Sequence, residues 1–532
     1  MALAISAQEL HRMTGLVIYP RSVTQYNETI FFLARRGRLK LLGVASEQDH
    51  LIAQYVGEVH PLRLGIRGEQ CVNLRLCPTS HANAVVLRQA LPFTSPQVVG
   101  VRKSAGCGDR LGLATPGHVR AMRKALCPDS LHSPQAATQT SSHEQIGIMP
   151  IFAQQSIREM DRTGRTPDQV MDDATWGAFQ EGWTQGFGAD ADHLKSVADM
   201  DACVDAGYVM YTVDPGAHVD DTAAMASPSE WAQRVEILPW NTLESSPQAM
   251  RAMYLSRAFD LGGFSLAFSE RELLLAAAKY GRAVAHTVTM YRHLAARMAG
   301  QPFELEMSVD ETATPTSAHE HLFVASELQR LGVRWVSLAP RFVGRFEKGV
   351  DYIGDRAQFR ADLIRHHAIA QALGPYKLSI HSGSDKFSIY PIIAEVAGDL
   401  VHLKTAGTSY LEALRTVATL DPPLFREILA FAKDRYPVDR ATYHVSAETS
   451  ALPEAQTLTD HELAAILDTF AGRQVLHVTF GSVLNACHAS GDYLFRNRLL
   501  EVLATNEDAY YALLENHIAR HVAPFAGKEH TS

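Results

Sequence analysis

Residues 188–195 read Gly-Ala-Asp-Ala-Asp-His-Leu-Lys, and a helical run then leads into an apolar strand over Tyr208–Asp214. A strand, a helix and a second strand in this order form the repeating unit of a parallel sheet covered by helices. Within the stretch, Asp192 stands directly beside His193. Neighbouring residues of a strand point to opposite faces, but at the very end of a strand both side chains can lean over the edge of the sheet. There one group could hold a metal ion while its neighbour moves a proton.

The same alternation of short apolar strands and helices runs outward from this unit, from about residue 96 onward. Several of the strands are nearly continuous apolar runs, which is typical of strands buried on both faces. Eight strand–helix units in a chain of this length predict an α/β fold, a (β/α)8 TIM-type barrel with insertions. Ten segments qualify, so two of them belong to an insertion or are not strands. The ten candidates are residues 98–102, 147–152, 187–192, 208–214, 303–309, 334–338, 377–381, 400–405, 441–445 and 475–480.

The barrel is expected to span residues 96–500, with smaller units on either side of it. Residues 1–95 read as mixed strand and helix, and they predict a small N-terminal α+β unit that caps the barrel or packs on it. The segment 131–145 is rich in Ser, Thr, Gln and His and is expected to be a mobile surface loop. Residues 501–532 are expected to form a closing helix and a polar tail. Within the N-terminal unit, the predicted strands are residues 17–19, 29–33 and 39–44.

The composition excludes several classes of protein. Of the 532 residues, 46% are hydrophobic and 20% are charged, as in an ordinary soluble globular protein. The net charge of −9 and the lack of a long basic run argue against nucleic acid as a partner. No stretch offers about 18 consecutive apolar residues, so no membrane span is expected. Polar residues interrupt the first 19 residues, which do not read as a signal peptide, and the six cysteines form no close pair; we therefore expect a cytoplasmic protein.

Histidines stand at the ends of several predicted strands, where a barrel carries its active site. A single histidine in such a place is more often structural than a ligand. Two of them have distinctive neighbours: His193 follows Asp192, and His381 opens the stretch His-Ser-Gly-Ser-Asp-Lys at residues 381–386. In that stretch Gly383 permits a tight turn, and backbone N–H groups could bind an anion. We therefore predict that His193 and His381 are metal ligands.

The sequence leaves the third metal ligand open. We predict His402, although it could instead lie buried within its strand; His444 is an equal rival, and an acidic residue is the other alternative. Neutral imidazoles with one open coordination position suit a divalent cation such as Zn, Mn, Co or Ni better than Ca or Mg.

Two kinds of charged side chain accompany the histidines. The strand 303–309 carries Glu304 and Glu306 on one face, and Glu311 follows its end. Burial inside a barrel would raise the pKa of such a glutamate and suit it to acid–base work. The alternative is that Glu306 forms an ion pair with Lys404 or Arg341.

The cations Arg341, Lys386 and Lys404 fall within strand ends or just past them. A fixed cation there would bind a carboxylate or phosphate, or stabilise an enolate, although a salt bridge on the rim of the barrel is the common alternative. The loop at 106–112 has the spacing G-x-G-x-x-x-G, which does not fit a dinucleotide loop, so NAD is excluded. That loop, which contains Asp109, could still hold substrate through its backbone amides.

Residues 188–214 resemble the second and third strands of class II, metal-dependent aldolases. In those enzymes an Asp-His pair ends one strand, and a helix that ends in Asp-Ala-Gly leads into the next, as Asp192-His193 and residues 205–207 do here. The His-Ser-Gly-Ser turn at His381 resembles their His-Gly-Gly-Ser turn, whose histidine is a metal ligand. The chain departs from the pattern at Arg341, where those aldolases would supply a further histidine.

A second resemblance covers nearly the whole chain from about residue 100. The strings at 108–118 and 339–342, the Asp-His stretch and residues 381–391 are similar to the tagaturonate/fructuronate epimerase family of hexuronate catabolism. The resemblance implies a barrel, a divalent metal and the interconversion of D-tagaturonate and D-fructuronate. It implies that Asp192 is the proton acceptor and Glu306 the proton donor, with Glu311 as the substitute for Glu306, and that His193 and His381 bind the metal.

An aldolase-type reaction can account for the epimerisation, so the two resemblances are consistent with each other. The two sugar acids carry a ketone at carbon 5 and differ at carbon 3, whose proton is β to both the ketone and the carboxylate and is not readily acidic. Cleavage and re-formation of the bond between carbons 3 and 4, a retro-aldol and aldol pair of steps, inverts that centre. We expect Arg341, Ser382, Lys404 and Asp109 to bind the hexuronate.

Two other functions remain open. One is a class II aldolase that releases two fragments from a sugar acid or sugar phosphate. The other is a non-catalytic sugar-acid binding protein, because a fold alone does not give a function. A homo-oligomer is also left open.

Overall fold

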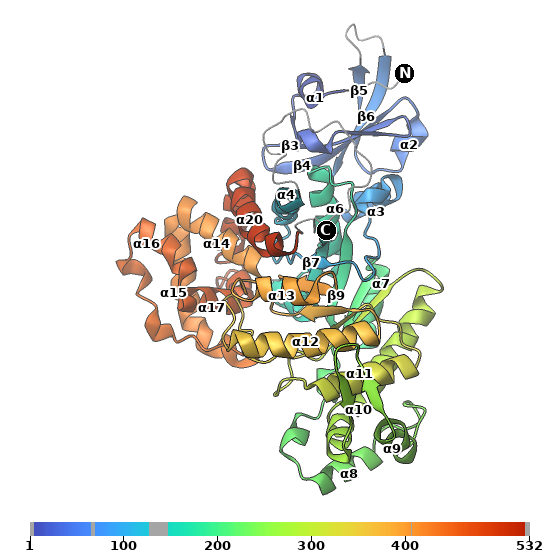
Figure 1. Ribbon diagram of the computed structural model, residues 1–532. Helices are drawn as coiled ribbons and strands as arrows, with labels where there is room; N and C mark the ends of the chain where they lie inside the picture. The colour runs from blue at the N-terminus through green and yellow to red at the C-terminus, as the bar shows by residue number, and fades with distance from the viewer. Residues whose placement is uncertain (1–4, 65–69, 127–146, 406, 527–532) are drawn as a thin grey trace, which may run out of the picture.

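The computed structural model describes residues 5–64, 70–126, 147–405 and 407–526 (Figure 1). A barrel lies at the centre of the molecule, with a small β-sheet above it, a helical insertion below it and a block of helices at one side. The predicted surface loop at 131–145 lies outside the described residues. In the part of the chain that is described, no helix is both long enough and apolar enough to cross a membrane.

The N-terminal sheet is antiparallel and has its own apolar core. Its strands lie in the order β1-β3-β4-β6-β5, and β2 pairs with β3. One face packs against the barrel helix α6 (Pro167–Gln180), whose Trp176 and Phe179 share a cluster with Phe31 and Val44. The sequence predicted the strands β1, β3 and β4 but missed β2, β5 and β6. The elements are α1 (Ala7–Thr14), β1 (Val17–Ile18), β2 (Thr24–Tyr26), β3 (Thr29–Arg36), β4 (Leu39–Ser46), α2 (Asp49–Ala53), β5 (Glu58–Leu64), β6 (Gln70–Pro78) and α3 (His81–Ala90).

The predicted (β/α)8 barrel is confirmed: eight parallel strands close on themselves. The strands are short, and the polar residues that follow them all lie at the same end of the barrel. Around the barrel the strands are β10 (Met210–Val213), β13 (Glu304–Ser308), β14 (Ser337–Ala339), β15 (Lys377–Ile380), β16 (Val401–Lys404), β7 (Ser104–Gly106), β8 (Met149–Ser156) and β9 (Gly188–Leu194).

Three of the ten predicted strands are wrong. Residues 98–102 precede the first barrel strand, which is β7, a few residues later. Residues 441–445 lie in a 3-10 turn and the irregular segment after it, and residues 475–480 belong to two helices, α17 (Phe470–Val478) and α18 (Phe480–Asn485). A short apolar run cannot distinguish a buried helix from a buried strand, and most of residues 475–480 are buried in a helical core.

Local sequence signals set the boundaries of the helix between β9 and β10. Helix α7 (Val197–Asp205) begins after Ser196, whose hydroxyl accepts the backbone N–H of Asp199 at 3.2 Å while Asp199 accepts the backbone N–H of Ser196 at 3.1 Å. This reciprocal cap satisfies two otherwise unpaired donors. Gly207, at a φ of 85°, ends the turn after the helix and leads into β10.

The other helices cover the barrel or extend it. After β10 the chain inserts two helices and a hairpin before the long helix α10 (Glu270–Met298); this insertion lies at the bottom of Figure 1. After β16 every regular element among the described residues is helical. The covering helices are α4 (Thr115–Leu126), α5 (Ile157–Thr163), α11 (Ala318–Arg330), α12 (Arg356–Ala372) and α13 (Tyr390–Ala397); the insertion holds α8 (Pro228–Glu236), α9 (Pro247–Leu255), β11 (Ala258–Asp260) and β12 (Ser265–Ala267); the last block adds α14 (Thr408–Leu420), α15 (Pro422–Asp439), α16 (Asp460–Ala465), α19 (Arg496–Thr505) and α20 (Glu507–Val522).

The interior of the barrel is unusually polar. Most barrels fill this space with branched apolar side chains. Here Asp190, Glu306, Lys377, His402 and Lys404 are all buried inside it. Buried charges are costly unless they are paired, so we expect these side chains to form ion pairs and hydrogen bonds with one another. The candidate active site lies next to them, at the mouth of the barrel.

Candidate active site

A bulge at the end of β9 turns Asp192 and His193 toward the same region. Tyr211 of β10 pairs with Ala191 and Val213 pairs with Leu194, so β9 holds one extra residue between these two pairs. His193 takes up this irregularity with a φ of 58°, a left-handed conformation that is rare outside glycine. Bulges beside active sites re-aim side chains in this way. The bulge explains how two adjacent residues of one strand can serve one site.

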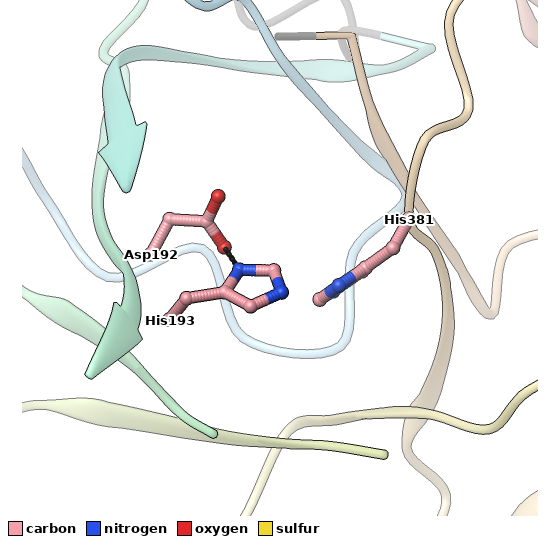
Figure 2. A group of neighbouring side chains, drawn as sticks. All are labelled: Asp192, His193 and His381. Atoms are coloured by element: carbon pink, nitrogen blue, oxygen red, sulfur yellow. Dashed lines mark hydrogen bonds and ion pairs between the residues drawn. The ribbon is translucent and has the colours of Figure 1, made fainter. Parts of the chain in front are cut away.

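The rings of His193 and His381 face each other across the mouth of the barrel (Figure 2). Their centroids are 4.9 Å apart, and the ring planes meet at 50°. Nδ1 of His193 lies 2.8 Å from Oδ1 of Asp192, so this carboxylate fixes the tautomer and leaves Nε2 free. Nε2 is buried and has no hydrogen-bond partner among the described residues. A buried imidazole nitrogen without a partner is a site for a ligand.

Two further carboxylates flank the imidazoles. Asp310, just past the end of β13, lies 3.1 Å from Nδ1 of His381 and 3.6 Å from Nε2 of His193. Glu306, inside β13, lies 2.6 Å from Nε2 of His381. Burial alone would lower the pKa of His193, but Asp192 and Asp310 hold that pKa well above its usual value. The site therefore has an excess of negative charge around two imidazoles, which favours a cation.

Lys404 forms ion pairs with three carboxylates inside the barrel. Its Nζ lies 2.7 Å from Asp192, 2.8 Å from Asp190 and 2.9 Å from Glu306. Burial would lower the pKa of Lys404, yet these three carboxylates hold it well above its usual value. Lys404 is thus a buried ammonium that is already neutralised by acids of the barrel.

The expected rise in the pKa of Glu306 is wrong. Burial does act in that direction, but Lys404 and His381 outweigh it and hold the pKa of Glu306 well below its usual value. The same balance, with Lys404 and His193, lowers the pKa of Asp192. Burial prevails instead at Glu304, deeper in the barrel, whose pKa is raised. Of the two readings left open for Glu306, the structure has the ion pair with Lys404.

The structure does not bring either candidate for the third ligand to the imidazole pair. His402 is fully buried in β16, where Nδ1 lies 2.9 Å from the hydroxyl of Ser104 and Nε2 lies 3.9 Å from Asp190. His444 is exposed and lines the outer cavity. The ligand atoms of Asp192, His193 and His381 all lie within 4.8 Å of one another. Of the alternatives that the sequence left open for the third ligand, an acidic residue, and neither histidine, lies beside the imidazole pair.

Two adjoining cavities lead from the outside to this group. The outer cavity has a volume of about 230 Å³, and the inner cavity, which reaches Asp192, His193 and Lys404, has a volume of about 40 Å³. The C-terminal helical block contributes to their walls, because Tyr443 lines both and His477 lines the inner one. Four residues line both cavities: Lys348, His381, Ser382 and Tyr443.

Of the other residues predicted to bind substrate, two line the outer cavity and one does not. Arg341 and Ser382 line the outer cavity, and the guanidinium of Arg341 donates to the carbonyl of Thr312. Asp109 lines neither cavity. Both of its carboxylate oxygens accept backbone N–H groups of its own loop, from Leu111 and Ala114 among others. That loop nevertheless positions Arg110, which lines the inner cavity.

Asp310, Lys348 and Tyr443 are among the residues of the site to which no role was assigned from the sequence. Asp310 carried a usable signal, because it follows a predicted barrel strand and is thus at the active end. Lys348 carried a weaker signal, since it lies well inside the long irregular segment between β14 and α12. Tyr443 carried none, since it lies in an irregular segment that follows α15. Only the fold brings those segments over the mouth.

A second group of metal-type side chains lies behind the turn at His381. It consists of Asp385, His517 and His521, all buried. Nε2 of His521 accepts the backbone N–H of Asp385 at 2.9 Å, and Nδ1 donates to the carbonyl of His517 at 2.8 Å. Both nitrogens of His521 are therefore bound to backbone groups, whereas the acids beside His381, Glu306 and Asp310, are themselves groups that can bind a cation. The second group fastens the turn to α20 and does not offer a free set of ligands.

Known proteins resemble the whole chain. The family model described as tagaturonate epimerase matches residues 19–128 and 129–525. A tagaturonate/fructuronate epimerase of Thermotoga maritima is 40% identical over 515 residues, which cover 96% of this chain and 97% of that protein.

Solved structures agree. The native crystal structure of the fructuronate-tagaturonate epimerase of Cohnella laeviribosi aligns with a TM-score of 0.86 at 36% identity and covers 98% of this chain and 99% of that one. A glycerol complex of the same enzyme aligns at 0.85, with 96% and 97% covered. The similarity to an aldolase of Escherichia coli, at a TM-score of 0.32 and 9% identity, is too low to support an argument.

Proposed function

The chain belongs to the tagaturonate epimerase family and is thus an epimerase, and from this premise we propose that it interconverts D-tagaturonate and D-fructuronate by breaking and re-forming the bond between carbons 3 and 4. The observation that carries the proposal is the group at the mouth of the barrel, where a paired carboxylate, two imidazoles and a buried lysine converge. Such a group supports charge stabilisation and proton transfer within one site.

The donor set fits a divalent transition metal. Nε2 of His193 is buried and unpartnered, and it faces the ring of His381. We assign these two imidazoles as ligands and Asp310 as the third, because Asp192 already accepts from His193 and from Lys404. When bound there, a cation of the Zn, Mn, Co or Ni type would act as a Lewis acid on the oxygen of the ketone.

Asp192 starts the reaction as the proton acceptor. Its carboxylate removes the proton from the hydroxyl of carbon 3, the bond between carbons 3 and 4 breaks, and the bonding electrons pass into an enediolate that includes the former ketone oxygen. Carbon 3 becomes an aldehyde. The low pKa of Asp192, which Lys404 and His193 maintain against burial, keeps this base ionised.

The proton must then return on the other side of carbon 3. After the aldehyde turns, carbon 4 attacks its opposite face, and the new alkoxide needs an acid. Lys404 lies 2.7 Å from Asp192 and 2.9 Å from Glu306, so the proton taken by Asp192 can pass to Lys404 while Lys404 gives one to Glu306. This relay allows Glu306 to act as the donor even though it is ionised at rest. Glu311, which pairs with Arg158 at 2.9 Å, is the alternative donor.

Incubation of the purified protein with D-tagaturonate, with and without a chelator, tests the proposed function. We expect D-fructuronate to accumulate to an equilibrium mixture, and we expect the chelator to stop its formation until a divalent cation is added back. Stoichiometric three-carbon products in place of fructuronate would assign the protein as an aldolase. Full activity after verified removal of all metal would refute the assigned metal.

A further inference from the structure

Five cations line the outer or inner cavity above Lys404, and a hexuronate needs one of them for its carboxylate. Three of the five are already neutralised by acids. Arg110 lies 2.6 Å from Glu159, Arg158 lies 2.9 Å from Glu311, and Arg345 lies 3.3 Å from Glu347. Arg341 and Lys348 have no carboxylate within 4.0 Å among the residues that the structure describes. A cation with no partner in the protein is the one that can bind an anion of the substrate.

Lys348 is the better placed of these two. It lines both cavities, whereas Arg341 lines only the outer one. Its Nζ donates to the hydroxyl of Ser382 at 2.7 Å, so the ammonium stands beside His381 and at the passage to Asp192. The guanidinium of Arg341 is directed to the carbonyl of Thr312 instead.

The residues on either side of Lys348 fix the backbone of the turn. The preceding residue, Glu347, is buried and accepts hydrogen bonds from Ser446 at 2.8 Å and from Gln474 at 2.7 Å. The following residue, Gly349, has a φ of 74°, and a Cβ there would lie 3.3 Å from Nδ1 of His477. The long side chain of Lys348 therefore extends from a fixed backbone, which lowers the entropy lost when it binds an anion.

We propose that Lys348 binds the carboxylate of the hexuronate and retains the aldehyde fragment while that fragment turns over. The inference rests on the proposed function. When the bond between carbons 3 and 4 breaks, the carboxylate stays on the fragment of carbons 1 to 3, and the ketone oxygen stays on the other. The aldehyde fragment has no other charged group by which the protein can keep it.

The choice of lysine suits a fragment that must rotate. An ammonium is a compact charge with three donors on a flexible stem, whereas a guanidinium holds a carboxylate in one plane through two parallel hydrogen bonds. Lys348 can thus hold the carboxylate while the aldehyde carbon presents its other face. Inversion at carbon 3 requires this movement, and escape of the fragment would end the reaction as a cleavage.

The test compares K348M and K348R with wild type, with R360M as the control. Arg360 of α12 is a half-exposed cation that pairs with Glu395 at 2.7 Å and lines neither cavity. For K348M we expect the KM for D-tagaturonate to rise about 10- to 100-fold, the usual effect of losing a hydrogen bond to a charged group, and we expect three-carbon products to appear beside the epimer. K348R should restore the KM to within about fivefold, and R360M should leave the KM and the products unchanged.

A neutral competitor separates charge recognition from a general loss of structure. The inhibition constant of the ketohexose that carries CH2OH in place of the carboxylate should be the same in K348M and wild type. An unchanged KM for tagaturonate in K348M, or an equal loss of affinity for the neutral sugar, would overturn the role of Lys348. If wild type itself fails to convert tagaturonate, the proposed function fails first, so the two failures are distinguishable.

Discussion

Asp192 and His193 lie together at the mouth of the barrel, and the sequence pointed to them because two adjacent polar residues end an apolar strand. The third ligand that we propose, Asp310, could not be predicted. The sequence offers several histidines near strand ends, and only the fold shows that His402 is turned into the barrel toward Ser104 while Asp310 reaches both imidazoles. The direction of the pKa shift of Glu306 was also beyond the sequence, since it depends on Lys404 from another strand.

The substitution D192N tests the residue that we assign as the base. An amide of the same shape cannot take the proton of the carbon 3 hydroxyl, so we expect turnover to fall by about 10²- to 10⁴-fold. The metal content should stay at the wild-type level, because His193 and His381 remain. The measurement is kcat together with elemental analysis of the same sample. Wild-type kcat in D192N would remove Asp192 from the mechanism.

The strands of the barrel were easier to predict from the sequence than the helices and loops around it. The apolar runs at residues 208–214 and 377–381 are strands because both of their faces are buried. Equally apolar runs at 475–480 became helix, since their neighbours complete a helical core. The bulge in β9 could not be predicted, because it arises from pairing with β10.

The turn at residues 381–386 depends on α20 and α17, which follow it by many residues. Asp385 lies 2.8 Å from Arg473 and 3.2 Å from His517, and its φ of 63° is a strained conformation. The turn that carries His381 and Ser382 is therefore held in place by helices of the C-terminal block.

For D385N we expect a loss of stability of about 3 kcal/mol, because Arg473 and the histidines would be left buried without their anion. Thermal unfolding measures this as a lower Tm. The matched control is D468N, which removes a carboxylate from Arg415 at the surface and should cost less than about 1 kcal/mol. Equal Tm values for the two variants would contradict the anchoring role of Asp385.

Buried histidines connect helices that lie far apart in the chain, and they make the free energy of unfolding of the whole protein depend on pH. Burial lowers the pKa of His118 to about 4, and Nε2 of this residue in α4 lies 2.7 Å from the hydroxyl of Ser409 in α14. Burial also lowers the pKa of His366 to about 4. The sequence shows these histidines but not their burial, because helices far apart in the chain must first pack together.

Each such group binds a proton more readily in the unfolded chain, with a pKa near 6.5, than in the folded protein. The stability that a neutral His118 provides is thus complete above pH 6.5 and is lost as the pH falls toward 4, by up to about 1.4 kcal/mol per pH unit. We expect the Tm to fall over this range, and we expect the fall to be smaller in H118Q. The control H60Q replaces a histidine whose side chain is 46% exposed and should follow wild type. An H118Q profile that also follows wild type would exclude His118 as a source of the acid sensitivity.

In the proposed mechanism, carbon 3 is inverted by cleavage of a carbon–carbon bond and not by removal of its hydrogen. Epimerisation in D2O, followed by NMR of the fructuronate that forms, distinguishes these two routes. We expect the hydrogen on carbon 3 to be retained through complete conversion, with no deuterium at that position. Deuterium that appears on carbon 3 at the rate of epimerisation would show that the hydrogen is removed and would refute the cleavage.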